Sequence, residues 1–228
     1  EYRVETGLQE TTGKNLIDLD EQTFNFINSE KDIGVVAKKT FPINIEWIDF
    51  LRSNEFSLAD IAAIYNEAKS FNGACFGMTS LVIQNYYGKI NVAQYQKNLF
   101  QRASVLHDLK RPAIDKDVQT LIGLNQCLVR CSKYQDARSK FMQSYKTDKS
   151  RMIYLIEKLK KIDQTRSPLL IDYALGGASG ATGAHAVVAY SLETDNAPYV
   201  YEGKEYAYKI CVIDPNQIYS SRNTGESS

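Results

Sequence analysis

The sequence predicts an α+β domain in which a helical lobe is followed by an antiparallel β-sheet lobe. Apolar residues recur at helical spacing over much of 44–163, whereas short strand-like runs separated by glycine and proline turns occupy 169–216. Helices first and strands second are typical of an α+β layout. Because 228 residues suffice for one domain of two lobes, we expect a single domain over 1–228 with a cleft between the lobes.

The N-terminal segment, residues 1–34, mixes polar residues with short apolar groups and predicts a loosely structured arm. A short strand is expected at 33–36, and a short helix over 44–53. Neither segment carries a residue whose chemistry points to a reaction.

Ser57 has the features of a helix start. Its hydroxyl and the carboxylate of Asp60 can bind the free N–H groups of a first turn, and Phe56 can pack onto Ile61. Leu58 and Ile61 then belong to the expected apolar face. This helix leads to the turn that precedes the most informative stretch of the chain.

Residues 72–87 begin with a glycine turn and continue as an apolar helix with Cys75 at the exit of the turn. Helical spacing places one set of apolar residues on a buried face, namely Met78, Leu81, Val82 and Tyr86. Unpaired N–H groups and the positive end of the helix dipole favour a thiolate at this position. Cys75 is therefore placed as a nucleophile should be.

Helical stripes continue through 91–163 and predict helices throughout; they begin at Val92, Val118, Tyr134 and Met152. The period then changes to that of strands at 169–175, 186–192 and 206–213. The glycine-rich run 176–183 joins the first two of these strands, and Asn-Ala-Pro and Glu-Gly turns precede the third.

Charge and hydropathy exclude several classes of function. The chain has 27 basic and 27 acidic residues, so no net field attracts nucleic acid. The chain contains no run of about 18 apolar residues, the length needed to span a membrane. The chain starts at Glu1 without a signal peptide and finishes in a polar tail, 217–228. We expect a piece of a longer, processed protein, which could belong to the cell surface.

Four cysteines do not make a disulfide scaffold in a chain of this length. Cys127, Cys131 and Cys211 are expected to be small buried hydrophobic residues. A disulfide between Cys127 and Cys131 would be awkward inside a helix, and their free or paired state stays open. With two histidines and no second cysteine pair, the chain implies no zinc site, other metal or organic cofactor.

Three polar residues lie where the local pattern does not require them: Cys75, His185 and Asp214. His185 begins a strand after the glycine loop, and Asp214 ends the third strand ahead of Pro215 and Asn216. Antiparallel pairing can bring Asp214 beside His185, so that one ring nitrogen binds the carboxylate while the other faces the thiol. This order gives a nucleophile, a base and an orienting group.

Each of the three residues has an ordinary explanation by itself: a buried thiol, an isolated histidine and a turn. Their combined positions, after a glycine turn, after a glycine loop and at a strand end, favour the catalytic interpretation. The only other histidine, His107, lies between leucines beside Asp108, and we expect it on the surface.

Gly73-Ala74-Cys75-Phe76 resembles the local signature around the nucleophile of the papain-like cysteine peptidases. The closer resemblance is to bacterial extracellular members, which pair a Gly-x-Cys-aromatic-Gly-Met motif with a His-Ala-Val-Val strand and an Asp-Pro-Asn corner. These motifs occur here at 73–78, 185–188 and 214–216. The resemblance covers three short motifs in the same order and does not extend to the helical segment between them.

Two positions depart from the papain pattern. The orienting residue of papain is Asn, whereas Asp214 is expected here, with Asn216 as the alternative. Papain has a Gln six residues before its nucleophile that stabilises the oxyanion, and Lys69 stands at that place. The N–H group of Cys75 is then the expected oxyanion donor, and the side chain of Asn72 is a candidate for the second.

The resemblance implies a secreted or cell-surface cysteine peptidase that hydrolyses peptide or protein substrates through a thioester. Backbone without side chains lets an extended peptide approach, so the glycine loop is expected to border the substrate groove. The groove candidates are Gly176, Gly177, Gly180, Gly183 and Ala184.

Two other kinds of function stay open at this point. Cell-wall amidohydrolases and transglutaminase-like acyltransferases use the same order of Cys, His and a polar third residue. A catalytically inactive papain-like fold could also serve as a binding or adhesion module, which the Lys69 position leaves open.

Overall fold

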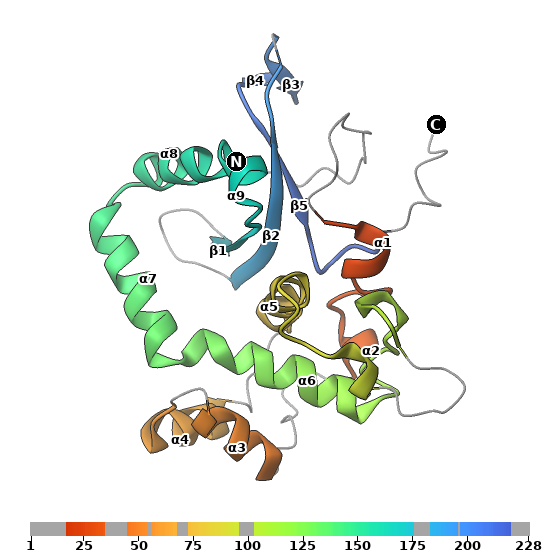
Figure 1. Cartoon of the computed structure of the whole chain (residues 1–228). Helices are drawn as coiled ribbons and strands as arrows, with labels where there is room; N and C mark the ends of the chain where they lie inside the picture. Colours follow the sequence, from red (N-terminus) through yellow and green to blue (C-terminus); the bar gives the residue numbers. More distant parts are fainter. Residues whose placement is uncertain are drawn as a thin grey trace.

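The computed structural model describes residues 17–34, 45–53, 56–67, 73–95, 103–175, 183–195 and 197–219. Within these ranges helices and antiparallel strands form an α+β structure, which confirms the α+β class that the sequence predicted (Figure 1). None of the helices in these ranges combines the length and the apolar character needed to cross a membrane.

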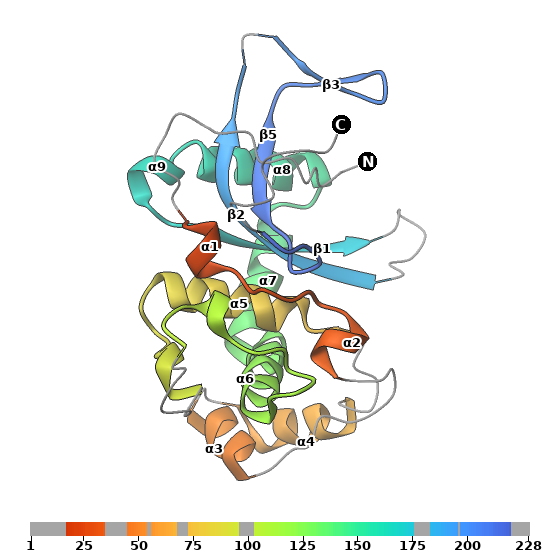
Figure 2. The same ribbon diagram turned by 90° about the vertical axis from the view of Figure 1, so that its right-hand side faces the viewer.

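Helix α5 (Cys75–Tyr86) lies at the centre of the fold, between the sheet and helix α6 (Lys116–Cys127) (Figure 2). Helices α3 (Ile45–Ser53) and α4 (Leu58–Glu67) lie beyond α6, away from the sheet. The seven consecutive residues 76–82 of α5 are buried. The sequence predicted one buried face, but the first half of this helix is enclosed on every side.

The main sheet has three antiparallel strands in the order β1–β2–β5. They are β1 (Leu169–Leu175), β2 (Gly183–Glu193) and β5 (Lys209–Ile213). Residues 185–190 of the central strand β2 are all buried, so both of its faces are covered. Helix α5 packs against β2, and so do α8 (Asp148–Leu159) and α9 (Ile162–Thr165).

A second pair of strands, β3 (Tyr199–Tyr201) and β4 (Lys204–Tyr206), forms a hairpin that projects from the far end of β2 and β5 (Figure 1). Its turn residues Glu202 and Gly203 both have positive φ, 47° and 73°, as a two-residue hairpin requires. The predicted single strand at 206–213 is therefore wrong in its first residues, because β4 ends at Tyr206 and β5 begins three residues later.

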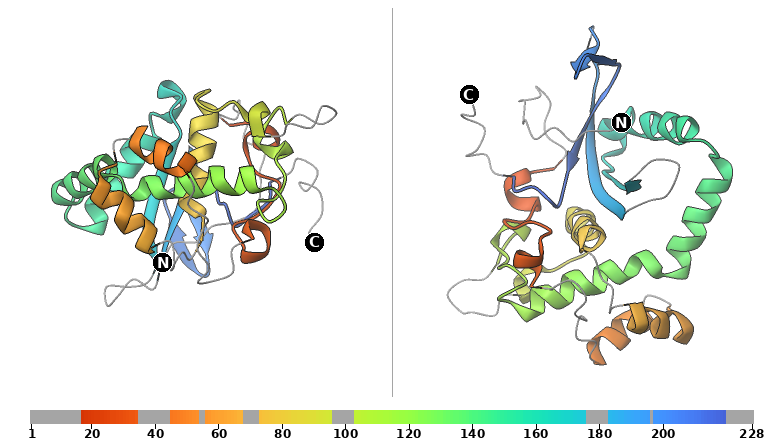
Figure 3. Two further views of the ribbon diagram at one scale, coloured as in Figure 1. Left: turned by 90° about the horizontal axis from the view of Figure 1, so that it is seen from below. Right: turned by 180° about the vertical axis from the view of Figure 1, so that it is seen from behind.

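Helices α6, α7 (Ser132–Ser144) and α8 follow one another in an arc outside α5 and the sheet (Figure 3). No residue of α7 is fully buried. Its first turn is nevertheless tied to the sheet, because the hydroxyl of Tyr134 donates to Asp172 of β1 at 3.0 Å. The ring of Tyr134 also meets Phe76 of α5 edge-on.

Continuous helix over 91–163 is a wrong prediction. Between residue 91 and α6, the described residues 91–95 and 103–115 contain the 3₁₀ turns η2 (Val92–Tyr95) and η3 (Leu106–Asp108) and no α-helix. The short 3₁₀ turn η4 (Leu128–Arg130) separates α6 from α7. The carboxylate of Asp108 accepts the N–H groups of Ser104 and Val105, which fixes a turn there instead of a helix.

The N-terminal segment differs from the predicted loose arm over its described part. It contains α1 (Leu19–Gln22) and α2 (Glu30–Ile33), and its residues Phe24 and Phe26 are buried. The strand expected at 33–36 is wrong at its start, because Ile33 belongs to α2, which ends at Gly34 with φ of 72°. Residues 35–36 lie outside the described part.

The predicted start of α4 is confirmed. The N–H group of Ser57 donates to the Asp60 carboxylate at 2.9 Å, and the N–H group of Asp60 donates to the Ser57 hydroxyl at 3.1 Å. Leu58, however, is 74% exposed, so its assignment to the buried face was wrong.

Gly77 allows α5 and α6 to cross closely. A Cβ atom at this position would overlap the carbonyl oxygen of Ile122 and lie 2.9 Å from the main-chain nitrogen of Gln126. The N–H group of Gly77 also donates to the side-chain oxygen of Gln126 at 2.7 Å. This contact holds the end of α5 that carries Cys75 against α6.

We expect Gly77→Ala to lower the free energy of unfolding by about 2–3 kcal/mol, since one added methyl group must push two backbones apart. Alanine in a helix otherwise stabilises by about 1 kcal/mol relative to glycine, so the sign alone is informative. Urea unfolding measures the change. The control Gly88→Ala has open space around it and φ of 64°, and should cost about 1 kcal/mol for its backbone alone. A more stable Gly77→Ala protein would contradict the close crossing.

Candidate active site

Cys75 is the first residue of α5, and the turn before it is built by Gly73 with φ of 127°. This φ lies in a region that favours glycine. The residue Ala74, just before the helix, provides no side-chain cap. Among the described residues no acceptor for the N–H group of Cys75 is found, and its side chain is only half-buried. The thiol is thus reachable from outside and lies beside a free N–H donor.

His185 is buried near the start of the central strand β2, with only 7% of its surface exposed. Its Nε2 atom donates to Oδ1 of Asp214 at 2.8 Å. Since Nε2 is occupied in this way, Nδ1 is the ring nitrogen left for the thiol of Cys75. The cross-strand neighbour Tyr173 meets the His185 ring edge-on, with 5.8 Å between ring centres.

The surroundings of His185 favour its charged form. Burial alone lowers its pKa, but hydrogen bonds to Asp214 and Cys75, together with the negative charges of both groups, outweigh burial and raise the pKa from 6.5 to about 9. Near neutral pH the ring is therefore an imidazolium. Because Cys75 contributes to this rise in the pKa of His185, its thiol lies near the ring.

Asp214 follows the last residue of β5 and is buried. Its N–H group donates to the hydroxyl of Tyr219 at 2.7 Å, and that hydroxyl donates to the carbonyl of Val212 at 3.2 Å. The Oδ1 atom accepts a second hydrogen bond from the N–H group of Asn216 at 2.8 Å. Main chain and side chain of Asp214 are thus both held by hydrogen bonds.

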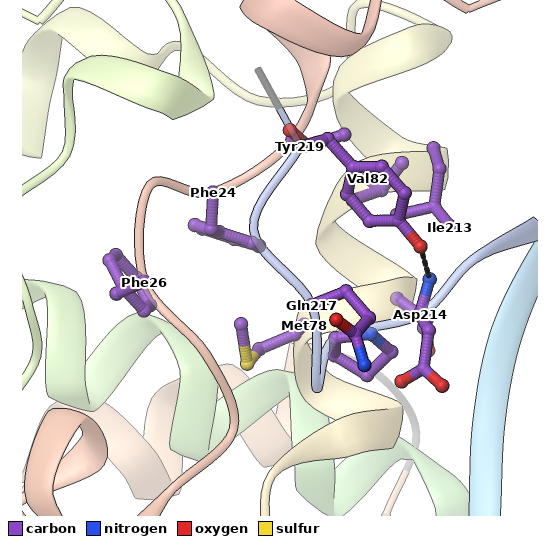
Figure 4. A pocket seen from close by; sticks show the side chains of 11 residues that line it. Phe24, Phe26, Met78, Val82, Ile213, Asp214, Gln217 and Tyr219 are labelled. Carbon is purple, nitrogen blue, oxygen red and sulfur yellow. Dashed lines mark hydrogen bonds between the residues drawn. The ribbon is translucent and has the colours of Figure 1, made fainter. Parts of the chain in front are cut away.

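A small pocket lies behind Asp214, on the side where its main chain meets Tyr219 (Figure 4). Phe24 and Phe26 of the N-terminal segment line it together with Met78 of α5. The pocket is mainly apolar, and in Figure 4 the carboxylate of Asp214 points away from Tyr219. We interpret the pocket as packing that supports the carboxylate.

The choice between Asp214 and Asn216 as the orienting residue follows from the hydrogen bonds of two amides. The N–H group of Ala74 can only donate, and it donates to Oδ1 of Asn28 at 2.7 Å. The other end of that amide, Nδ2, then donates to Oδ1 of Asn216 at 3.3 Å. Asn216 consequently turns its Nδ2 toward His185, at 3.4 Å from Nε2.

A donor cannot accept the proton that Nε2 carries. Asn216 is therefore excluded as the acceptor in this arrangement, and the acceptor is Asp214. The sequence favoured Asp214 but left Asn216 as an alternative, and this pattern of hydrogen bonds favours Asp214.

The remaining predicted site residues are placed in part. Gly183 and Ala184 are exposed at the start of β2, directly before His185. The other candidates for the groove and the oxyanion hole lie outside the described residues; these are Asn72, Gly176, Gly177 and Gly180, together with Lys69.

His107 is not the surface residue that the sequence predicted. It is half-buried in the turn η3, and its Nδ1 atom is buried without a partner among the described residues. Its carbonyl oxygen accepts a hydrogen bond from the side chain of Asn25. Leucines on both sides, which are fully buried, draw the residue inward.

All four cysteines are free thiols. Burial raises the pKa of Cys127 to about 12, and burial and Glu193 do the same for Cys211. Cys127 is buried as expected, whereas Cys131 and Cys211 are only partly so. Cys131 lies at the start of α7, where its sulfur accepts the N–H group of Tyr134. Cys127 and Cys131, four residues apart in the sequence, therefore do not share a helix.

Sequence reasoning missed two residues at this site, Asn28 and Tyr173. Burial raises the pKa of Tyr173, and the charges of Asp214 and Cys75 add to this rise. The register of β1 against β2, which pairs it with His185, was not predicted. Asn28 carries no local signal, because its contacts are all with distant parts of the chain.

Comparison with protein-family models, with curated proteins and with solved structures found no match to this chain. Within the ranges that the structure describes, no three His, Cys, Asp or Glu side chains are grouped so that they could hold a metal ion.

Proposed function

We propose that the protein is a cysteine peptidase with a papain-like arrangement, in which Cys75 is the nucleophile, His185 the acid and base, and Asp214 the orienting group. The observation that carries the proposal is the convergence at His185. One ring nitrogen binds a buried carboxylate, and the reachable thiol of Cys75 at a helix start is near enough to help raise the pKa of the ring. In the sequence, Cys75 lies more than a hundred positions from both His185 and Asp214.

The reactive form is the thiolate of Cys75 paired with the imidazolium of His185. A pKa of about 9 keeps His185 protonated near neutral pH, and the free N–H groups at the start of α5 stabilise negative charge on the sulfur. The hydrogen bond to Asp214 fixes the ring so that Nδ1–H points toward the sulfur.

In the first half of the reaction, the thiolate attacks the carbonyl carbon of a peptide bond and forms a C–S bond. The carbonyl oxygen becomes an oxyanion, which the N–H group of Cys75 is placed to bind. The C–N bond then breaks as Nδ1 of His185 gives its proton to the leaving amine. A thioester and a neutral His185 remain.

In the second half, neutral His185 removes a proton from water, and the resulting hydroxide attacks the thioester carbonyl carbon. The C–S bond breaks, the acid product leaves, and the thiolate–imidazolium pair is restored. Neither half-reaction requires a cofactor. Asp214 contributes by holding the ring and stabilising its charged form throughout.

The exposed backbone of Gly183 and Ala184 supports a peptide or protein as the substrate. Both residues lie directly before His185 and carry little or no side chain, so an extended chain can approach the sulfur beside them. We place the groove there, between the helical part and the sheet. A secreted or cell-surface location is proposed on the papain-like motifs alone.

The experiment offers the protein three substrates in parallel: a peptide library, purified peptidoglycan, and an acyl donor with an amine acceptor. We expect new N-termini from the peptide library, detected by mass spectrometry, and little product from the other two. Release of cell-wall fragments would instead indicate an amidohydrolase, and transfer to the amine a transglutaminase-like enzyme.

Labelling with iodoacetamide near neutral pH separates all of these enzymes from a binding module. An ion-paired thiolate should be modified at Cys75 well before the other three cysteines. Slow and equal labelling of all four cysteines would overturn the proposal in favour of an inactive fold.

A further inference from the structure

Asn28 joins the two parts of the chain that carry the candidate catalytic residues. Its Oδ1 accepts the N–H group of Ala74 at 2.7 Å, directly before Cys75. On its other side, its own N–H group donates to the carbonyl of Pro215 at 2.7 Å, and its Nδ2 donates to Asn216 at 3.3 Å. Three hydrogen bonds from one residue therefore connect the turn that carries Cys75 to the corner that follows Asp214.

The segment around Asn28 is itself anchored. Phe26, two residues earlier, is only 1% exposed. The N–H group of Ile27 donates to the carboxylate of Asp32 at 3.1 Å, and Arg111 pairs with the same carboxylate at 3.4 Å. Asn28 thus lies on a fixed support instead of a free loop, so its amide can hold other groups in place.

Asn28 also packs against the turn itself. A Cβ atom on Gly73 would lie 3.4–4.0 Å from the amide of Asn28, an ordinary van der Waals contact. The amide therefore lies beside the turn that it binds.

We propose that Asn28 is a positioning residue that sets the distance between the thiol of Cys75 and the ring of His185. It does so by locking the turn before Cys75 onto the corner that holds Asp214, which in turn holds His185. Asn28 also fixes the orientation of the Asn216 amide, so that Nε2 of His185 is left to Asp214. The inference rests on the proposed thiolate–imidazolium pair.

The test compares Asn28→Ala with Asn28→Asp and with the matched control Asn25→Ala. Alanine removes both side-chain hydrogen bonds, whereas aspartate keeps an acceptor for Ala74 and loses the donor to Asn216. Asn25 lies in the same segment, and its amide binds the carbonyl of His107, away from the site. The control therefore removes one side-chain hydrogen bond from this segment without touching the catalytic residues.

The readout is the rate of Cys75 alkylation by iodoacetamide at about pH 6 and at about pH 10, since only the ion pair supplies thiolate at the lower value. We expect Asn28→Ala to slow alkylation at the lower pH by roughly tenfold to a hundredfold, because a small displacement breaks the pair. At the higher pH, where thiols ionise without help, its rate should match that of the wild type. At the lower pH, the alkylation rate of Asn28→Asp should lie between the rates of Asn28→Ala and of the wild type.

Asn25→Ala should show the wild-type ratio of the two rates. If Asn28→Ala and Asn28→Asp also keep that ratio, the positioning role is wrong while the peptidase proposal stands. If wild-type Cys75 itself shows no excess reactivity at the lower pH, both proposals are overturned. Urea unfolding of each variant shows whether a variant with a changed ratio of the two rates is still folded. If Asn28→Ala is unfolded, the comparison rests on Asn28→Asp.

Discussion

Replacement of Cys75 by alanine is expected to abolish peptide hydrolysis, with a loss of roughly 10⁴-fold or more. The variant has no sulfur atom with which to form the thioester. Because the side chain is only half-buried, removing the sulfur leaves the packing of α5 intact. The loss should therefore appear in activity and not in the urea unfolding curve.

The matched control for this variant is Cys211→Ala. Cys211 is also a partly buried free thiol, but it lies in β5 and its sulfur donates to Glu193 at 3.1 Å. Burial keeps it protonated at neutral pH, since its pKa is raised to about 12. Its removal should leave kcat/KM within about threefold of the wild type, as expected for a residue outside the reaction.

Hydrolysis that survives in Cys75→Ala, measured with a peptide found in the library, would rule out this thiol as the nucleophile. Loss of activity in both variants would point to a general fall in folded protein. Only a selective loss in the first supports the reaction described above.

The parts of the fold that could be predicted are those with a complete local cause. The Ser57–Asp60 capping pair and the positive-φ turn at Glu202 and Gly203 need only neighbouring residues. The helix expected around residue 106 failed because apolar spacing does not reveal a competing local bond: the Asp108 carboxylate turns back onto Ser104, four residues earlier, and replaces the helical bonds.

The candidate site shows the same division. Cys75, His185 and Asp214 could be predicted because each follows or ends an element with a recognisable turn beside it. Whether Asp214 or Asn216 accepts the proton of His185 was left open, since it depends on where the N–H group of Ala74 finds its acceptor. Asn28 could not be predicted at all, because its role exists only once three separate segments have come together.

Replacement of Asp214 by asparagine should lower kcat/KM by roughly 10²- to 10⁴-fold near neutral pH, as for the orienting carboxylate of a catalytic triad. The amide still offers an oxygen to Nε2 of His185, but it carries no charge. Among the groups that raise the pKa of His185 to about 9, Asp214 contributes the strongest hydrogen bond and also a negative charge. Without that charge, burial lowers the pKa of the ring.

The pH profile tests this cause directly. The leaving amine needs the proton of the imidazolium, so activity of the wild type is lost as pH rises through about 9. In Asp214→Asn this alkaline limb should move toward neutral pH.

The same proton stabilises the folded wild type, because the folded pKa of about 9 exceeds the ordinary 6.5. That stabilisation is complete below pH 6.5 and is lost through pH 9, and the variant should lack most of it.

Asn216→Ala is the control that separates the orienting residue from its neighbour. Asn216 presents only a donor to Nε2, at 3.4 Å, so its removal should lower the rate modestly and leave the alkaline limb where it is. If the limb moves in Asn216→Ala and stays in place in Asp214→Asn, the amide orients His185 and the chain of hydrogen bonds from Ala74 is not the one drawn above. A limb that moves only in Asp214→Asn ties the charge of His185 to one buried carboxylate at the end of β5.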